Sequence, residues 1–309
     1  MQKPDSPMLV KPESQNQTRE LTIAGYQIKP IRGGFFGLDG GAMFGTVPKV
    51  LWEKTNPADD HNRISMQTRL LLLVSESRKI LIDTGMGSDF VQKHGEKLGS
   101  KFAELYGVKG ETQIFNELQK YGVKASEITD VILTHLHFDH AGGATKHDGT
   151  ALVATFENAK YYVQKANLET AVNANVREKA SYLAPNWQAL VNQNKLVLLD
   201  GDVKNVLPGI SVQVVNGHTT GQQIVWVEDS QNTLVYCADL IPMSTHVRLP
   251  WVMGYDLRPL DLIEEKRQIL NKLAKVHGYV YFEHDPYVDA ATVEAFRDDF
   301  TVNEKFLLG

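Results

Sequence analysis

The sequence predicts an α/β fold in which two β-sheets pack face to face and helices cover their outer sides. Runs rich in β-branched residues alternate with amphipathic helical segments, and each half of the chain is a group of strands followed by helices. A chain of 309 residues, 42% of them hydrophobic, can bury about three quarters of its unfolded surface in such a core. We expect residues 1–18 to form a disordered arm and residues 19–309 to form a single domain.

The first half is predicted to contain strands separated by turns and short helices. The signals are an imperfect apolar alternation, a glycine-dense stretch, a hairpin spacing and an amphipathic run. The expected elements are a strand at 20–31, turns at 33–45, a hairpin of 66–74 and 79–82, a helix over 111–122 that ends at Gly122, a helical start at 126–129 and a strand at 131–134.

The second half is predicted to begin with helices, because residues 161–183 favour helix and contain neither Gly nor Pro. Strands then follow at short intervals, as their β-branched composition indicates. The expected elements are strands at 197–200, 210–215, 222–229 and 232–239, a helix at 260–275, a strand at 279–282 and a final helix at 291–299.

Composition excludes several classes of protein. Thirty-two Lys and Arg against 37 Asp and Glu leave a net charge of −5. Proteins that bind the phosphate backbone of nucleic acids usually carry an excess of positive charge, so nucleic acid is not an expected partner. The longest apolar run, Leu70–Val74, is far shorter than the roughly 18 residues of a membrane span, and no membrane partner is expected. Cys237 is the single cysteine, which excludes an intrachain disulfide. These features predict a soluble, cytoplasmic protein.

The strongest chemical signal is a cluster of histidines and an aspartate just past a predicted strand. His135 and His137 are two residues apart, so on extended backbone they point the same way and can share one metal. Asp139 and His140 can join them only if the backbone turns, which the glycines at 142–143 would allow. Imidazole and carboxylate suit zinc, manganese, iron or cobalt. The alternative is a polar loop whose histidines only form hydrogen bonds.

Three further candidate ligands each lie at the end of a predicted strand: His218, Asp239 and His284. Functional residues concentrate where strands give way to loops, so we expect all three to join the same metal site. Each residue taken alone also has a structural explanation: His218 as a turn residue, Asp239 as a helix cap and His284 as a surface loop residue.

The whole pattern resembles the metallo-β-lactamase superfamily of dinuclear hydrolases. It comprises HxHxDH at 135–140, the three later ligands, and Asp83 in ILIDTG. The resemblance covers nearly the whole chain from about residue 20 and implies a four-layer αββα sandwich of two mixed β-sheets flanked by helices. Four segments resemble the branch that contains quorum-quenching N-acyl-homoserine lactone lactonases, namely 38–54, 134–143, 238–242 and 282–286.

The resemblance also implies a division of the ligands between two divalent cations, for which zinc is expected, with iron, manganese or cobalt as alternatives. Asp239 would bridge both cations, and Asp83 would orient a histidine ring from outside the ligand set. The first cation would be held by His135, His137 and His218, and the second by Asp139, His140 and His284.

The implied activity is the opening of a small-molecule lactone of the N-acyl-homoserine type by a hydroxide between the two metals. Asp139 is the candidate catalytic residue, as the group that carries a proton to the leaving oxygen. Another carboxylic ester, thioester or phosphotriester hydrolase on the same site is the main alternative, because the ligands specify only hydrolysis. A non-catalytic metal-binding protein is a further alternative.

Two departures from the family pattern concern the pocket. The lactonases have a tyrosine three residues after the bridging aspartate that contacts the substrate carbonyl, whereas this chain has Pro242. That role is therefore vacant or filled by another donor, such as His246 or Tyr255. In addition, the loop after Asn216 reads GHTTGQ where many members have GHTPGH.

Several apolar residues in loop-like segments offer a place for an acyl chain. Core packing or a homodimer contact explains each of them equally well. They are Met43, Phe44, Trp52, Trp251 and Met253.

Overall fold

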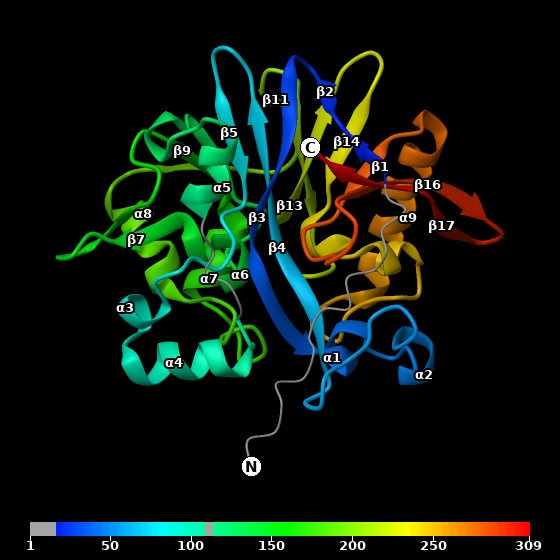
Figure 1. The fold of residues 1–309 in the computed structure, drawn as a ribbon, viewed down its shortest axis with the longest axis horizontal. Coiled ribbons are helices and arrows are strands. Elements are labelled where there is room, and N and C mark those ends of the chain that lie inside the picture. Colours follow the sequence, from blue (N-terminus) through cyan, green and yellow to red (C-terminus); the bar gives the residue numbers. More distant parts are fainter. Residues whose placement is uncertain (1–16, 109–113) are drawn as a thin grey trace.

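The computed structural model describes residues 17–108 and 114–309. Two β-sheets lie face to face in the centre of the molecule, and helices lie on their outer sides (Figure 1). Each sheet combines parallel and antiparallel strand pairs. The predicted fold class, an α/β sandwich of two mixed sheets flanked by helices, is confirmed.

The sheets differ in size, and a separate short hairpin is formed by β7 (Thr145–His147) and β8 (Leu152–Ala154). In spatial order, the seven-stranded sheet consists of β10 (Leu196–Leu199), β9 (Lys160–Gln164), β6 (Asp130–Ile132), β5 (Lys79–Ile82), β4 (Arg63–Val74), β3 (Tyr26–Asp39) and β2 (Leu21–Ile23). The eight-stranded sheet consists of β1 (Gln17–Arg19), β17 (Asp299–Leu308), β16 (Ala290–Phe296), β15 (Tyr279–Tyr281), β14 (Thr233–Tyr236), β13 (Gln222–Glu228), β12 (Ile210–Val215) and β11 (Val203–Leu207).

The helices are distributed unequally between the two outer sides. Most lie beside the seven-stranded sheet, whereas the long α9 lies beside the eight-stranded sheet (Figure 1). The α-helices are α1 (Gly40–Phe44), α2 (Lys49–Trp52), α3 (Phe90–His94), α4 (Glu96–Leu105), α5 (Ile114–Lys120), α6 (Phe138–Ala141), α7 (Lys165–Val172), α8 (Gln188–Asn192) and α9 (Pro259–Val276). Short 3₁₀ helices occur at Ala125–Glu127, Gly142–Ala144, Ala184–Asn186, Ala238–Leu240 and Ser244–Val247.

The run of leucines in β4 shows how the layers form. Side chains alternate across a strand, so Leu71 and Leu73 point between the sheets and pack in one cluster with Val225 of β13. Leu70 and Leu72 point the other way, into a cluster under the outer helices. All four are fully buried, and each such leucine contributes about 1.5–3 kcal/mol relative to exposure. The continuous apolar run is therefore a central strand covered on both faces.

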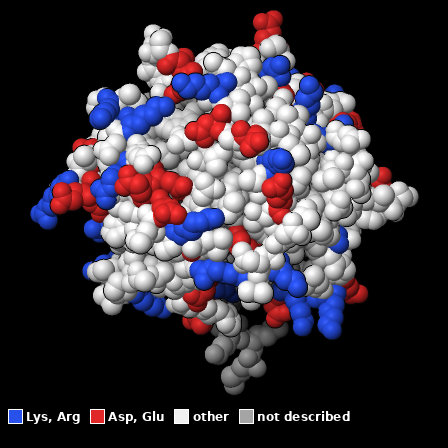
Figure 2. Space-filling view, turned by 180° about the vertical axis from the view of Figure 1, so that it is seen from behind, with Lys and Arg blue, Asp and Glu red and all other residues white. Residues whose placement is uncertain are grey.

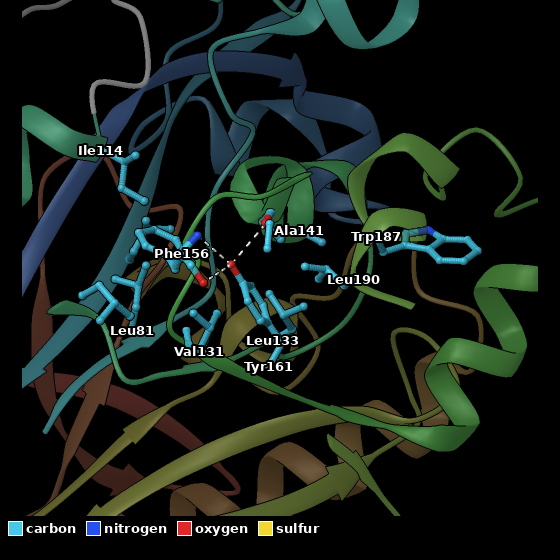
Figure 3. Close-up of a cluster of buried hydrophobic side chains, with 14 of the residues drawn as sticks. Leu81, Ile114, Val131, Leu133, Ala141, Phe156, Tyr161, Trp187 and Leu190 are labelled. Atoms are coloured by element: carbon cyan, nitrogen blue, oxygen red, sulfur yellow. Dashed lines mark hydrogen bonds between the residues drawn. The ribbon is translucent and has the colours of Figure 1, made fainter. Parts of the chain in front are cut away.

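Figure 3 shows part of the outer cluster of the seven-stranded sheet, which includes residues on both sides of the histidine motif. Leu133 and Ala141, on either side of the motif, are both buried in it. Tyr161 ties the cluster together, because its hydroxyl accepts a hydrogen bond from the backbone N–H of Phe156 at 2.9 Å and donates to the carbonyl of Ala144 at 3.3 Å. This packing holds the ends of the motif in place.

Many elements agree with the sequence prediction. The hairpin of β4 and β5 is confirmed, as is the helix at 260–275, which is α9. Helix α5 matches the predicted helix at 111–122, although residues 109–113 lie outside the described residues. Residues 1–16, most of the predicted arm, also lie outside them, and its last two residues belong to β1, which pairs in parallel with β17.

Turns were the wrong prediction for the first half of the glycine-dense stretch. Strand β3 continues through it to Asp39, paired with β4, and only then does α1 begin. The register shifts between Arg32 and Phe35, and Gly34 adopts a φ of 116° there. The glycine thus permits a bulge that bends a long strand, which a sequence reading cannot distinguish from a turn.

One predicted helical segment is helical only in part, and the predicted final helix is wrong. The first part of 161–183 is β9, which pairs in parallel with β6 and β10, and only α7 is helical within that range. The predicted final helix at 291–299 is instead a hairpin of β16 and β17, turning at Arg297 with a φ of 57°. In both segments, pairing with neighbouring strands outweighs helix propensity.

The surface carries charges of both signs. On the face opposite to that of Figure 1, Lys and Arg side chains are interspersed with Asp and Glu (Figure 2). Among the described residues, no helix is both long enough and apolar enough to cross a membrane.

Candidate metal centre

The seven predicted ligands lie together where strands of both sheets end. The loop after β6 supplies two of them, α6 supplies two more, and single residues follow β12, β14 and β15. Helix α6 begins at Phe138, so the backbone makes the turn that brings Asp139 and His140 back toward the histidines. Among the described residues, three groups have potential ligand atoms within 4.8 Å of one another. Two of them contain only predicted ligands: His135, His137, His218 and Asp239, and Asp139, His140 and His284. The third consists of Asp83, His140 and Glu283.

In the first group, one ring nitrogen of each of three imidazoles points toward a common centre. Nδ1 of His137 lies 3.0 Å from Nε2 of His135 and 3.2 Å from Nε2 of His218. All three residues are buried. Nitrogens so close together cannot each carry a proton toward the others, so the arrangement favours a shared cation at their centre.

The second group is built from two imidazoles and a carboxylate. The Nε2 atoms of His140 and His284 lie 3.4 Å apart. Oδ1 of Asp139 lies 3.8 Å from Nε2 of His140, and its Oδ2 lies 3.8 Å from Nε2 of His284. This geometry again directs the potential ligand atoms of three side chains toward one point.

Asp239 lies between the two groups and turns one oxygen toward each. Its Oδ2 is 3.1 Å from Nε2 of His218 and 3.9 Å from Nε2 of His135. Its Oδ1 is 3.2 Å from Nε2 of His284 and 3.5 Å from Nε2 of His140. A carboxylate so placed can serve both groups at once.

The residues present fit a pair of divalent cations. Oδ1 of Asp239 is buried and has no hydrogen-bond partner among the described residues, a costly state that a cation would relieve. Nitrogen and carboxylate donors in this number suit zinc and neighbouring transition metals.

Burial and nearby charges shift the pKa values of the histidines in the centre. Burial and neighbouring imidazoles hold the pKa of His135 and His137 well below the ordinary 6.5. Burial also opposes protonation of His218, yet Asp239 and Asp256 raise its pKa to about 10. Because imidazole must be neutral to bind a metal, a cation would take the place of the protons that these carboxylates attract.

The ring nitrogen of His140 that points away from the centre, Nδ1, faces two carboxylates. Its Nδ1 lies 3.0 Å from Oδ2 of Asp83, as predicted, and 3.0 Å from Oε2 of Glu283. Asp83 is fixed by accepting hydrogen bonds from Thr134, at 2.7 Å from the backbone N–H and 2.6 Å from the hydroxyl. Burial raises the pKa of Glu283 to about 7. These partners direct Nε2 of His140 toward the centre.

His218 and His284 also have hydrogen-bond partners for the ring nitrogen that points away from the centre. Nδ1 of His218 lies 2.9 Å from Oδ1 of Asp256, and Nδ1 of His284 lies 2.9 Å from the carbonyl of Gln67. Buried Arg69 holds the segment that follows His284 by donating to the carbonyl of Val288 at 3.1 Å. Each ring thereby presents its Nε2 to the centre.

The two glycines after the motif are required by close packing. A Cβ at Gly142 would lie 2.2 Å from the carbonyl oxygen of Met86, and a Cβ at Gly143 would lie 2.3 Å from that of Thr84. Neither residue has a positive φ. The turn that these glycines were expected to allow is made by α6, which precedes them, and the glycines instead let the motif approach the segment after β5.

A cavity of about 210 Å³ opens onto the centre. Met43 and Met253 line this cavity. Phe44 and Trp52 instead stack on each other, with their ring centroids 5.2 Å apart, and belong to a hydrophobic core cluster. The ring of Trp251 packs edge-on against Phe44, so this residue also takes the core role.

The cavity wall distinguishes the two candidates for the role of the tyrosine that is missing at Pro242. His246 is buried, and its Nε2 lies 2.8 Å from the carbonyl of Met43, so it is not available. Tyr255 does line the cavity, together with Tyr106. Burial, with Asp139 nearby, raises the pKa of Tyr106, so its hydroxyl keeps its proton at neutral pH.

Sequence reasoning missed three residues of this site. Glu283 stands beside a predicted ligand, which was a usable signal, but Asp256 and Tyr106 lie in segments without a recognisable pattern. Their proximity to the centre depends on the tertiary fold alone.

Comparisons with known proteins agree with this geometry. The sequence profile of the family described as the metallo-beta-lactamase superfamily matches residues 66–284. An N-acyl homoserine lactonase of Bacillus cereus is 28% identical over 232 residues, which cover 72% of this chain and 83% of that protein.

Two solved structures extend the likeness to the fold. A probable metal-dependent hydrolase from Staphylococcus aureus has a TM-score of 0.82 at 32% identity, covering 93% of this chain and 98% of that one. AidC, a dizinc quorum-quenching lactonase in complex with a product, has a TM-score of 0.76 at 21% identity, covering 95% and 99%. At that identity AidC supports the fold alone.

Proposed function

Because the chain belongs to the metallo-beta-lactamase superfamily of metallo-hydrolases, we propose that it is a dinuclear lactonase acting on lactones of the N-acyl-homoserine type. Its similarity to the lactonase of Bacillus cereus favours this substrate class over other esters. The observation that carries the dinuclear part is Asp239, whose two oxygens face two separate groups of ligands.

We assign the ligands as the geometry groups them. Zinc is the proposed metal, since imidazole and carboxylate donors in sets of three suit it. When bound, the two cations would lower the pKa of water, so that hydroxide exists near neutral pH, and would polarise the lactone carbonyl. The first would be held by His135, His137 and His218, the second by Asp139, His140 and His284, and Asp239 would contact both.

Asp139 is the proposed proton carrier. It lines the cavity and is buried beside the second group, with its oxygens 3.8 Å from His140 and His284. A carboxylate there can hold a proton at one oxygen and release it to the alkoxide that forms when the ring opens.

Tyr106 and Tyr255 are the proposed groups that orient the substrate. Both line the cavity, and the hydroxyl of neither donates to a partner among the residues of 17–108 and 114–309. Burial, with Tyr106 and Asp39 nearby, raises the pKa of Tyr255 to about 12. Both hydroxyls therefore remain available to donate a hydrogen bond to a substrate oxygen.

The test is a metal-replete preparation assayed on a panel of lactones, aryl esters and phosphotriesters. We expect elemental analysis to find two metal ions per chain and the highest kcat/KM on an N-acyl homoserine lactone. A single ion per chain would contradict the dinuclear assignment. If esters or phosphotriesters were turned over and lactones were not, the substrate class would be wrong and the hydrolase would remain.

Replacing His284 by Ala should weaken the second cation and spare the first. His284 is the only ligand of the second group outside the 135–140 motif, and it does not belong to the first group. Metal titration should then show one tight site and one weakened site. Equal loss of both ions would argue against the division, and His61→Ala, an exposed histidine outside both groups, serves as the control.

A further inference from the structure

Lys266 is a fully buried lysine on α9, the long helix on the outer side of the eight-stranded sheet (Figure 1). Its three N–H donors each have a backbone carbonyl as acceptor, those of Arg248 at 2.8 Å, Trp251 at 2.9 Å and Leu249 at 3.4 Å. Burial lowers the pKa of Lys266 to about 7, although the charge of Asp256 opposes the shift. An apolar side chain of similar length would fill the space without the cost of a buried charge, so these hydrogen bonds need an explanation.

The three carbonyls belong to the start of residues 248–258, a segment without helix or strand that leads into α9. Lys266 lies about two turns inside that helix, so the segment is anchored by the element that follows it. Met253 and Tyr255 of the segment line the cavity that opens onto the metal centre. This part of the cavity wall therefore depends on hydrogen bonds made outside regular secondary structure.

Asp256 connects the same segment to a ligand proposed for the first cation. Its Oδ1 lies 2.9 Å from Nδ1 of His218, and its Oδ2 accepts a hydrogen bond from the backbone N–H of Met253 at 2.7 Å. The backbone N–H of Leu257 also donates to the carbonyl of His218 at 3.1 Å. The segment that Lys266 anchors at one end thus holds His218 at the other.

We propose that Lys266 is a positioning residue of the metal centre, which fixes residues 248–258 so that Asp256 stays against His218 and the first cation binds tightly. The inference rests on the proposed division of the ligands and extends it to a residue that does not line the cavity at the centre. Loss of a carboxylate that orients a metal-bound imidazole typically weakens metal binding about 10- to 100-fold. Lys266 acts on Asp256 through the backbone, so its effect should lie at the lower end of that range.

The test measures both zinc affinities of the metal-free protein by titration against a chelator, in wild type, Lys266→Met, Asp256→Ala and the double variant. We expect Lys266→Met to weaken about tenfold the cation that His284→Ala spares, and to leave the other unchanged. The double variant should bind the weakened cation no less tightly than Asp256→Ala alone, because two changes along one chain of contacts are not additive.

Leu270→Ala is the control for a loss of stability alone. Leu270 lies on the same helix and is fully buried in the hydrophobic cluster beneath it, so its truncation leaves a cavity and lowers the free energy of unfolding. Both zinc affinities should stay as in the wild type. If Lys266→Met does not fold, Lys266→Gln, which keeps two N–H donors on a shorter side chain, takes its place with the same expectation.

Three results would overturn the inference while the two-cation assignment stands: an unchanged first affinity in Lys266→Met, equal weakening of both cations, or additive losses in the double variant. No substrate is present, so the identity of the lactone does not affect the outcome. If the wild type holds fewer than two cations, the assignment fails, and hydrogen–deuterium exchange of residues 251–258 in the metal-free proteins decides the anchoring role. Faster exchange in Lys266→Met than in Leu270→Ala supports it, and equal exchange in the two variants excludes it.

Discussion

Asp239→Ala should abolish the binding of both cations and lower lactone turnover about 1,000-fold or more. Its two oxygens lie 3.1 Å from His218 and 3.2 Å from His284, so one substitution removes a ligand from each group. Cations that polarise a carbonyl stabilise the transition state by several kcal/mol, and each 1.36 kcal/mol is tenfold in rate. Elemental analysis and kcat/KM on the same preparation measure both effects.

A control must separate metal loss from unfolding. Asp130 is also a buried carboxylate, but it lies at the opposite end of β6 from the motif and is paired with Arg78 at 2.8 Å. Asp130→Asn should lower the free energy of unfolding while the protein keeps both metals. If Asp239→Ala retained one tightly bound ion, Asp239 would belong to a single group and the bridging role would be wrong.

The candidate ligands could be predicted from the sequence because they follow strands that the pattern indicates clearly. The motif at 135–140 is compact, and β12, β14 and β15 are rich in β-branched or aromatic residues and end close to His218, Asp239 and His284. The structure brings these residues together because the strands end at the same edge of the sandwich. Local pattern and sheet geometry are enough for this step.

The surrounding residues could not be named in the same way. Asp256 lies 38 residues after His218 and reaches it only because the chain folds back, and Tyr106 faces the cavity through the position of α4. Strands β16 and β17 could not be predicted either, because their residues favour a helix and form strands only through pairing with neighbouring strands. Such contacts follow from tertiary structure, which no local pattern encodes.

Asp139→Asn should retain much of the metal but lower lactone turnover about 100- to 10,000-fold, the usual cost of losing a general acid or base. The substitution keeps an oxygen of similar reach beside His140 and His284, and removes the charge and the site that holds a proton. We would measure metal content and kcat for the wild type and the variant on the same lactone.

An activated aryl ester separates proton delivery from metal binding. Its leaving group departs without protonation, so the variant should lose far less activity on it than on a lactone. Asp139 is close to both histidines of the second group, and a loss of metal would therefore lower both activities by the same factor. Equal losses with the metal still bound would contradict proton delivery and leave Asp139 as a ligand only.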